Sequence, residues 1–319
     1  MNSKKVLIIF GTRPETIKMA PVIAEFRKRP RWEVKVCFSG QHWELAEQVF
    51  PVFGIQPDFD LAVMKKGQSL FDVTTAILRG MEQIFKTYLP DIVLVQGDTT
   101  TVLAASLAAF YRKVSVGHIE AGLRTGSRYS PYPEEMNRLL TTRLSNLHFA
   151  PTELSRRNLL KENIADSDIF VTGNTVIDAL FYAEKILLND HKLLKSLDER
   201  FAEISVDKKM ILVTGHRREN HGDGILNICA AIRHLAGRQD IELIYPVHPN
   251  PNIHDVVARE LAGFANVHLI QPLDYLSFLY MMRRSFLVMS DSGGVQEEAP
   301  SLGKPVLVMR ESTERPEAL

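Results

Sequence analysis

The sequence predicts an α/β protein built from two consecutive domains, each a parallel sheet with helices on both faces. Short, β-branched apolar runs alternate with helix-length amphipathic segments, the pattern of a doubly wound fold. The alternation stops in a long helical and charged stretch and then restarts. A length of 319 residues also suits two domains of about 150 residues better than one.

Six strands are predicted in the first domain, to which we assign residues 1–172. Their sequences are near-continuous apolar runs, as a parallel sheet covered on both faces requires. In chain order they are VLIIF (6–10), EVKVCF (33–38), DIVLVQ (91–96), VSVGHI (114–119), LHFAP (147–151) and DIFVTG (168–173).

Five strands are predicted in the second domain, to which we assign residues 173–319. It is Rossmann-like, as is the first. Its strands are MILVTG (210–215), IELIYPV (241–247), NVHLI (266–270), FLVMSD (286–291) and KPVLVM (304–309).

The composition excludes several classes of protein. With 38 basic and 38 acidic residues, the chain has no basic surface of the kind that nucleic acids require. Cys37 and Cys229 are read as small buried hydrophobes. The first apolar run is too short for a signal peptide, and no segment approaches the ~20 apolar residues of a membrane span. We therefore expect a cytoplasmic protein that binds neither nucleic acid nor membrane.

Polar clusters follow the predicted strands at the edge where open parallel sheets bind ligands. With two domains, these clusters are expected to converge on a central cleft. They are GTRPE, GDTTT, HIEAG, GHRREN and DSGGVQEE.

The second domain carries a candidate phosphate cradle. Ser292, Gly293 and Gly294 stand where a strand turns into a helix, and backbone N–H groups there favour an anion. Glu298, one turn later, is placed to accept from ribose hydroxyls. The alternative is a tight turn with a serine cap. His216 follows another buried strand and could neutralise a pyrophosphate or move a proton.

The first domain carries candidate anion-binding and acidic residues. Arg13 and Lys18 would reach an anion from a loop that lacks the second and third glycines of the dinucleotide fingerprint, which argues against bound NAD. Asp98 ends a strand and by itself reads as an N-cap. Glu120 also ends a strand, and Glu134 begins a helix.

Three further interpretations concern neighbouring residues. Glu135 is read as the solvated neighbour of Glu134, and His118 as a hydrogen-bonded sheet residue. His248 is read as a polar residue at a strand end. No ligand spacing for a metal occurs near these acids, so no metal site is predicted.

The motifs FGTRPETIKMAP, GDTTT, GHIEAGLRTG, YSPYPEEMNR, TGNTVIDAL, VTGHRREN, YPVHPNP and DSGGVQEEAPSLGKPVLVMRESTERPEA run along the whole chain. Together they resemble the non-hydrolysing UDP-N-acetylglucosamine 2-epimerases. The resemblance implies a GT-B-like fold, no cofactor, a homodimer and a role in supplying surface polysaccharide. It also implies conversion of UDP-N-acetylglucosamine to UDP-N-acetylmannosamine, by elimination of UDP to 2-acetamidoglucal and its re-addition.

The resemblance also implies roles for individual residues. The essential carboxylates would be Asp98, Glu120 and Glu134, with His216 also implicated, and Gln41 would belong to a second, activating site. There Gly67 replaces an expected arginine. The UDP-binding residues would be Arg13, Lys18, His216, Phe278, Ser292, Gly293, Gly294, Glu298 and Arg315.

Two alternatives accompany this interpretation. The family pattern predicts further residues beyond Leu319 that complete the second sheet, so the second domain is expected to be truncated. A nucleotide-sugar-binding fragment without turnover is therefore one alternative. The other is a GT-B glycosyltransferase that uses UDP-N-acetylglucosamine with an acceptor.

Overall fold

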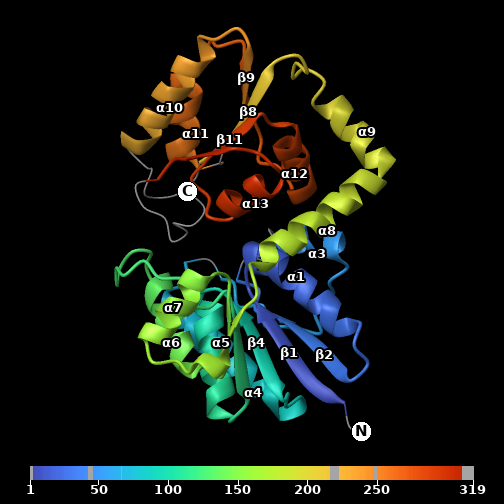
Figure 1. Cartoon of the computed structure of the whole chain (residues 1–319), viewed down its shortest axis with the longest axis vertical. Coiled ribbons are helices and arrows are strands. Elements are labelled where there is room, and N and C mark those ends of the chain that lie inside the picture. Colours follow the sequence, from blue (N-terminus) through green and yellow to red (C-terminus); the bar gives the residue numbers. More distant parts are fainter. Residues whose placement is uncertain (1–2, 42–45, 66, 216–222, 248–249, 311–319) are drawn as a thin grey trace. The chain divides into compact units, whose positions relative to one another are not determined.

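The structure is a computed structural model that describes residues 3–41, 46–65, 67–215, 223–247 and 250–310. Its contacts divide the chain into two compact units, Met1–Ala179 and Leu180–Leu319. Each unit holds one parallel sheet (Figure 1), which confirms the predicted fold class of two parallel-sheet α/β domains. The predicted cleft between the domains stays a prediction.

The first unit contains a seven-stranded sheet with the order β3-β2-β1-β4-β5-β6-β7. All six predicted strands are present, and every pairing is parallel. The strand order reverses between β1 and β4, which is the switch point where such sheets bind ligands. The strands are β1 (Lys4–Phe10), β2 (Trp32–Phe38), β3 (Phe59–Asp60), β4 (Ile92–Gln96), β5 (Ser115–Ile119), β6 (Leu147–Ala150) and β7 (Ile169–Val171).

The helices of the first unit mostly begin at a side-chain cap. Thr12 and Ser69 each form a capping box with an acidic residue three positions later, and Thr99 and Thr152 cap with their hydroxyls. The helices are α1 (Arg13–Arg27), α3 (Phe50–Phe53), α4 (Leu70–Thr87), α5 (Thr100–Tyr111), α6 (Glu134–Leu144), α7 (Glu153–Lys161), the 3-10 turn η1 (Asp166–Asp168) and α8 (Thr175–Asn189), which continues into the second unit.

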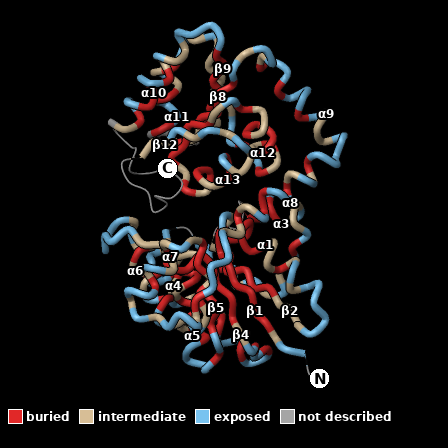
Figure 2. The backbone as a smooth tube through the Cα atoms, in the orientation of Figure 1, coloured by how far each residue is buried: buried red, intermediate tan, exposed pale blue. Residues whose placement is uncertain are grey.

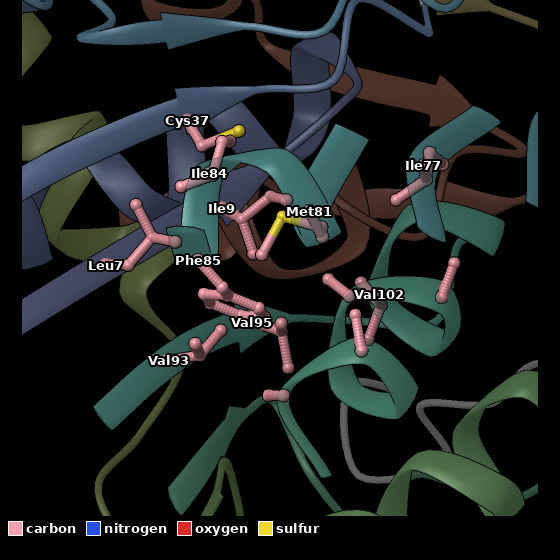
Figure 3. Packing of buried hydrophobic residues seen from close by; sticks show 14 of the residues in the cluster. Leu7, Ile9, Cys37, Ile77, Met81, Ile84, Phe85, Val93, Val95 and Val102 are labelled. Carbon is pink, nitrogen blue, oxygen red and sulfur yellow. The ribbon is translucent and has the colours of Figure 1, made fainter. Parts of the chain in front are cut away.

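Both faces of the first sheet are buried, which explains its continuous apolar strands. Leu7 and Ile9 of β1 pack with α4 and α5 on one face (Figure 3), while Ile8 and Phe10 pack with α1 on the other. Strands β1, β4 and β5 are accordingly among the most buried segments in Figure 2. Cys37 lies in the first of these clusters and Cys229 in the core of the second unit, so both are small buried hydrophobes as predicted.

The second unit contains a five-stranded parallel sheet with the order β10-β9-β8-β11-β12. All five predicted strands are present. The elements are α9 (His191–Arg200), β8 (Lys209–Thr214), α10 (Asp223–Ala236), β9 (Ile241–Pro246), α11 (Pro251–Glu260), β10 (Val267–Ile270), α12 (Tyr275–Arg284), β11 (Leu287–Ser290), α13 (Val295–Ser301) and β12 (Val306–Val308).

Among the residues described, no helix combines the length and the apolar character needed to cross a bilayer.

Candidate functional site

The loop after β1 is built around a buried carboxylate, Glu15. One oxygen of Glu15 accepts hydrogen bonds from the backbone N–H groups of Gly11, at 2.7 Å, and Thr12, at 2.8 Å. Its other oxygen accepts from the hydroxyl of Thr99, at 2.5 Å. Glu15 thus ties the loop after β1 to the loop after β4, and burial raises the pKa of its carboxyl. Arg13 begins α1 beside it and is half-buried.

Glu15 was not predicted as a site residue, although the sequence carried a signal for it. Thr12 and Glu15 have the spacing of a capping box, which places the glutamate over the start of a helix.

Glu120 lies directly after β5 and is held by donors from three other segments. The ammonium of Lys18 donates to both carboxylate oxygens, at 2.7 and 2.6 Å. The side-chain amides of Gln96 and Asn174 donate to one oxygen each, Asn174 at 3.0 Å. Glu120 has a φ of +63°, in the left-handed region that a glutamate seldom adopts. These contacts fix the carboxylate of a residue that is only 8% exposed.

Asp98 follows β4 and pairs with Arg138 of α6. The Nε of Arg138 lies 3.1 Å from the Oδ2 of Asp98, and its Nη2 binds the same oxygen. The side-chain amide of Asn137 donates to the backbone carbonyl of Asp98, at 2.9 Å. Asp98 is therefore held by consecutive residues of one helix.

Glu135 is not the solvated neighbour that we predicted. It is 2% exposed, and its carboxylate accepts from Nη1 of Arg138, at 3.0 Å. It also accepts from the backbone N–H groups of Thr125 and Gly126. The physical reason is that an arginine one turn along the helix and two loop amides compensate the buried charge.

Glu134 is the first residue of α6 and is half-buried. It stands three residues before Asn137 and four before Arg138, both of which bind Asp98. Residues three and four apart lie on the same face of a helix. The first turn of α6 thus brings Glu134 into the neighbourhood of Asp98.

His118 of β5 supports the turn that carries Asp98. Its Nε2 lies 2.7 Å from the carbonyl oxygen of Gly97, so this nitrogen carries the hydrogen and donates. Burial lowers the pKa of His118 to about 4, which keeps the ring neutral. The predicted hydrogen-bonded sheet residue is confirmed.

Gln41, the candidate for an activating site, follows β2. Its side-chain oxygen accepts from the hydroxyl of Thr101, at 3.0 Å, and Thr101 lies 2.9 Å from the hydroxyl of Ser39. A Cβ added to Gly11 would lie 2.1 Å from the Ser39 hydroxyl, so only glycine fits there. The same added Cβ would lie 3.3 Å from the Cβ of Gln41, so Gln41 lies close to the loop after β1.

The second unit presents its candidate cradle between β11 and α13. The N–H of Ser292 donates to the hydroxyl of Ser290, at 3.0 Å, and Gly293 is buried. Glu298 is 8% exposed, and its Oε2 would lie 3.4 Å from a Cβ added to Gly294. The structure thus brings Glu298 next to the glycine turn.

The other candidates of the second unit are divided between described and undescribed residues. Phe278 is half-buried on α12. His216, Arg315 and His248 lie outside the residues that the structure describes. Within the described ranges, no group of three or more histidine, cysteine or acidic side chains could hold a metal ion.

Comparison with known sequences gives consistent matches along the chain. A family model described as UDP-N-acetylglucosamine 2-epimerase matches residues 24–319. The UDP-N-acetylglucosamine 2-epimerase of Salmonella typhimurium is 55% identical over 316 residues, which cover 99% of this chain and 84% of that protein.

Comparison with solved structures agrees. The UDP-GlcNAc 2-epimerase of Neisseria meningitidis, bound to UDP-GlcNAc, has a TM-score of 0.93 at 53% identity and covers 98% of this chain and 85% of its own. The Methanocaldococcus jannaschii enzyme, in complex with UDP-GlcNAc and UDP, has a TM-score of 0.84 at 35% identity, with coverages of 98% and 86%. A family 9 glycosyl transferase of Veillonella parvula, at 12% identity and a TM-score of 0.52, shares the fold alone.

Proposed function

The chain belongs to the UDP-N-acetylglucosamine 2-epimerase family of isomerases, and from this membership we propose that it interconverts UDP-N-acetylglucosamine and UDP-N-acetylmannosamine. The relatives solved with UDP-GlcNAc and with UDP support this choice of substrate. The product is a nucleotide-activated sugar, and we propose that it serves as a precursor of a surface polysaccharide.

The proposed reaction is an elimination followed by an addition. The bond between C1 and the pyrophosphate oxygen breaks, UDP leaves with the electron pair, and a carboxylate takes the proton from C2. The resulting 2-acetamidoglucal then receives UDP at C1 and a proton on the opposite face of C2. Because C2 has no adjacent carbonyl, cleavage at C1 must run ahead and make the C2 proton acidic.

Such a route needs acidic groups on both faces of the sugar ring. We assign this work to Asp98, Glu120 and Glu134, with His216. The observation that carries the assignment is the placement of the three acids at the ends of β4 and β5 and in the first turn of α6. Glu120 would also lie 3.8 Å from a Cβ at Gly97, the residue before Asp98.

We assign the binding of UDP mainly to the second domain. Backbone N–H groups of the turn at Ser292, Gly293 and Gly294 would meet the phosphates, and Glu298 would accept from the ribose hydroxyls. The proximity of Glu298 to Gly294 supports this arrangement. The remaining proposed contacts are Arg13, Lys18, His216, Phe278 and Arg315. Gln41 is proposed for an activating site and a homodimer as the assembly.

The experiment that tests this function is incubation with UDP-N-acetylglucosamine alone in heavy water. We expect the epimer to form with deuterium at C2. A glycosyltransferase would release UDP only when an acceptor is added. A non-catalytic binding protein would be stabilised against heat by UDP and would leave C2 unlabelled. Either of the last two results would overturn the proposal.

A further inference from the structure

The guanidinium of Arg138 is arranged as a clamp on one oxygen of Asp98. Both its Nε and its Nη2 donate to Oδ2. Within the described part of the chain, no hydrogen bond ends on Oδ1, and the side chain of Asp98 is 27% exposed. Asp98 therefore presents one anchored oxygen and one open oxygen.

The guanidinium of Arg138 is itself held by a second carboxylate, that of Glu135. The third nitrogen of the guanidinium, Nη1, donates to the buried Glu135, which also accepts the backbone N–H groups of Thr125 and Gly126. The side chain of Arg138 is only 5% exposed. Because all three nitrogens are engaged and the group is planar, the plane of the guanidinium is fixed.

The surroundings of Asp98 differ from those of Glu120. Both oxygens of Glu120 receive hydrogen bonds, from Lys18 and from one amide each. A carboxylate with both oxygens occupied must give up a bond before it can take a proton, whereas Asp98 need not.

We propose that Arg138 is a positioning residue for the epimerisation. It holds Oδ2 in place, so that Oδ1 is directed away from the helix and can exchange a proton with the sugar. Glu135 acts indirectly, because it fixes the guanidinium of Arg138. This inference rests on the proposed function, since it assigns a role within that reaction.

The test is Arg138→Lys, with Arg124→Lys as its matched control. Lysine keeps the charge but has a single donor nitrogen, so it cannot replace the two nitrogens of the planar guanidinium that bind Asp98. Arg124 also donates to a carboxylate, Glu162, through Nε and Nη2 and also contacts α6, at Thr142. Neither Arg124 nor Glu162 is placed in the proposed site, so this control reports the structural cost of losing such a pair.

In Arg138→Lys, we expect kcat and the rate of C2 deuterium exchange to fall about 100-fold, since a misplacement of about 1 Å has that cost, with KM unchanged. Arg124→Lys should keep both rates. Glu135→Gln, which leaves Asp98 and Arg138 in place, should lower kcat in the same direction and serves if Arg138→Lys does not fold.

The outcomes separate the clamp from the proposed function. An active wild type with an Arg138→Lys variant of normal kcat overturns the clamp alone, as does an equal loss in both lysine variants. A wild type without C2 exchange overturns both.

Discussion

The ammonium of Lys18 and the carboxylate of Glu120 form a buried ion pair that joins α1 to the end of β5. The two oxygens of Glu120 lie 2.7 and 2.6 Å from the Lys18 nitrogen, and the two side chains are 11% and 5% exposed. A charge at this depth is costly unless its partner stays in place. Loss of either residue should therefore destabilise the site.

Lys18→Met is expected to lower the free energy of unfolding by about 3 kcal/mol, because it leaves Glu120 buried without its counter-charge. Glu120→Gln likewise leaves the ammonium of Lys18 buried without its counter-charge. The double variant should lose less than the two single losses together. Urea unfolding of the four proteins measures the cycle, and additive losses would show that the pair contributes no coupling.

The loop carboxylate Glu15 should make stability fall as pH rises. Burial raises its folded-state pKa above the ordinary 4.5, so between these values only the folded state carries the proton. The linkage relation then makes the free energy of unfolding decrease with rising pH. In Glu15→Gln this decrease is absent. As pH rises above 4.5, the free energy of unfolding of the variant should therefore increase relative to that of the wild type. Above the folded-state pKa of Glu15, the difference between the two proteins should be constant. A constant difference from pH 4 upward, in urea titrations, would contradict this.

His118 should have the opposite effect at acidic pH. Its folded-state pKa is lowered to about 4 from the ordinary 6.5, so below pH 6.5 the unfolded state binds a proton that the folded state does not. Stability should fall by about 3 kcal/mol between pH 6.5 and 4, since one pKa unit is worth about 1.4 kcal/mol. His118→Gln keeps a donor for Gly97 and lacks this loss. Parallel pH curves for the two proteins would disprove the assignment.

Gly11→Ala should destabilise the loop after β1. The new Cβ would lie 2.1 Å from the hydroxyl of Ser39 and 2.5 Å from that of Thr101. Overpacking of this kind costs about 1–3 kcal/mol. Adding Ser39→Ala removes the closer atom and should restore part of the loss, with Ser39→Ala alone as the control. A Gly11→Ala variant as stable as the wild type, in urea unfolding, would mean that the loop relaxes freely.

The strands were predictable because burial on both faces leaves a local mark in the sequence. Val6, Ile8 and Phe10 pack into the core on one face of the sheet, and Leu7 and Ile9 pack into the core on the other face. The whole run must therefore be apolar. Strand β3 escaped prediction because its two residues, Phe59 and Asp60, are too few to form a pattern.

Asp98 and Glu120 could be predicted as site residues because each follows the end of a strand. Their partners could not be found in this way. Arg138 lies 40 residues beyond Asp98, and Asn174 lies 54 residues beyond Glu120. An amide or an arginine at such a distance has no characteristic spacing. The burial of Glu135 was missed for a different reason, because two of its partners are backbone amides of a preceding loop, and backbone donors leave no mark in the residue types.

The anchoring of Glu135 by the N–H groups of Thr125 and Gly126 makes these two amides natural spectroscopic reporters. A ligand that pulls on Asp98 would act on Arg138 and through it on Glu135. The amide proton resonances of Thr125 and Gly126 would then shift, although neither residue need touch the ligand. NMR could thus detect the binding of a ligand to Asp98 without turnover of the sugar.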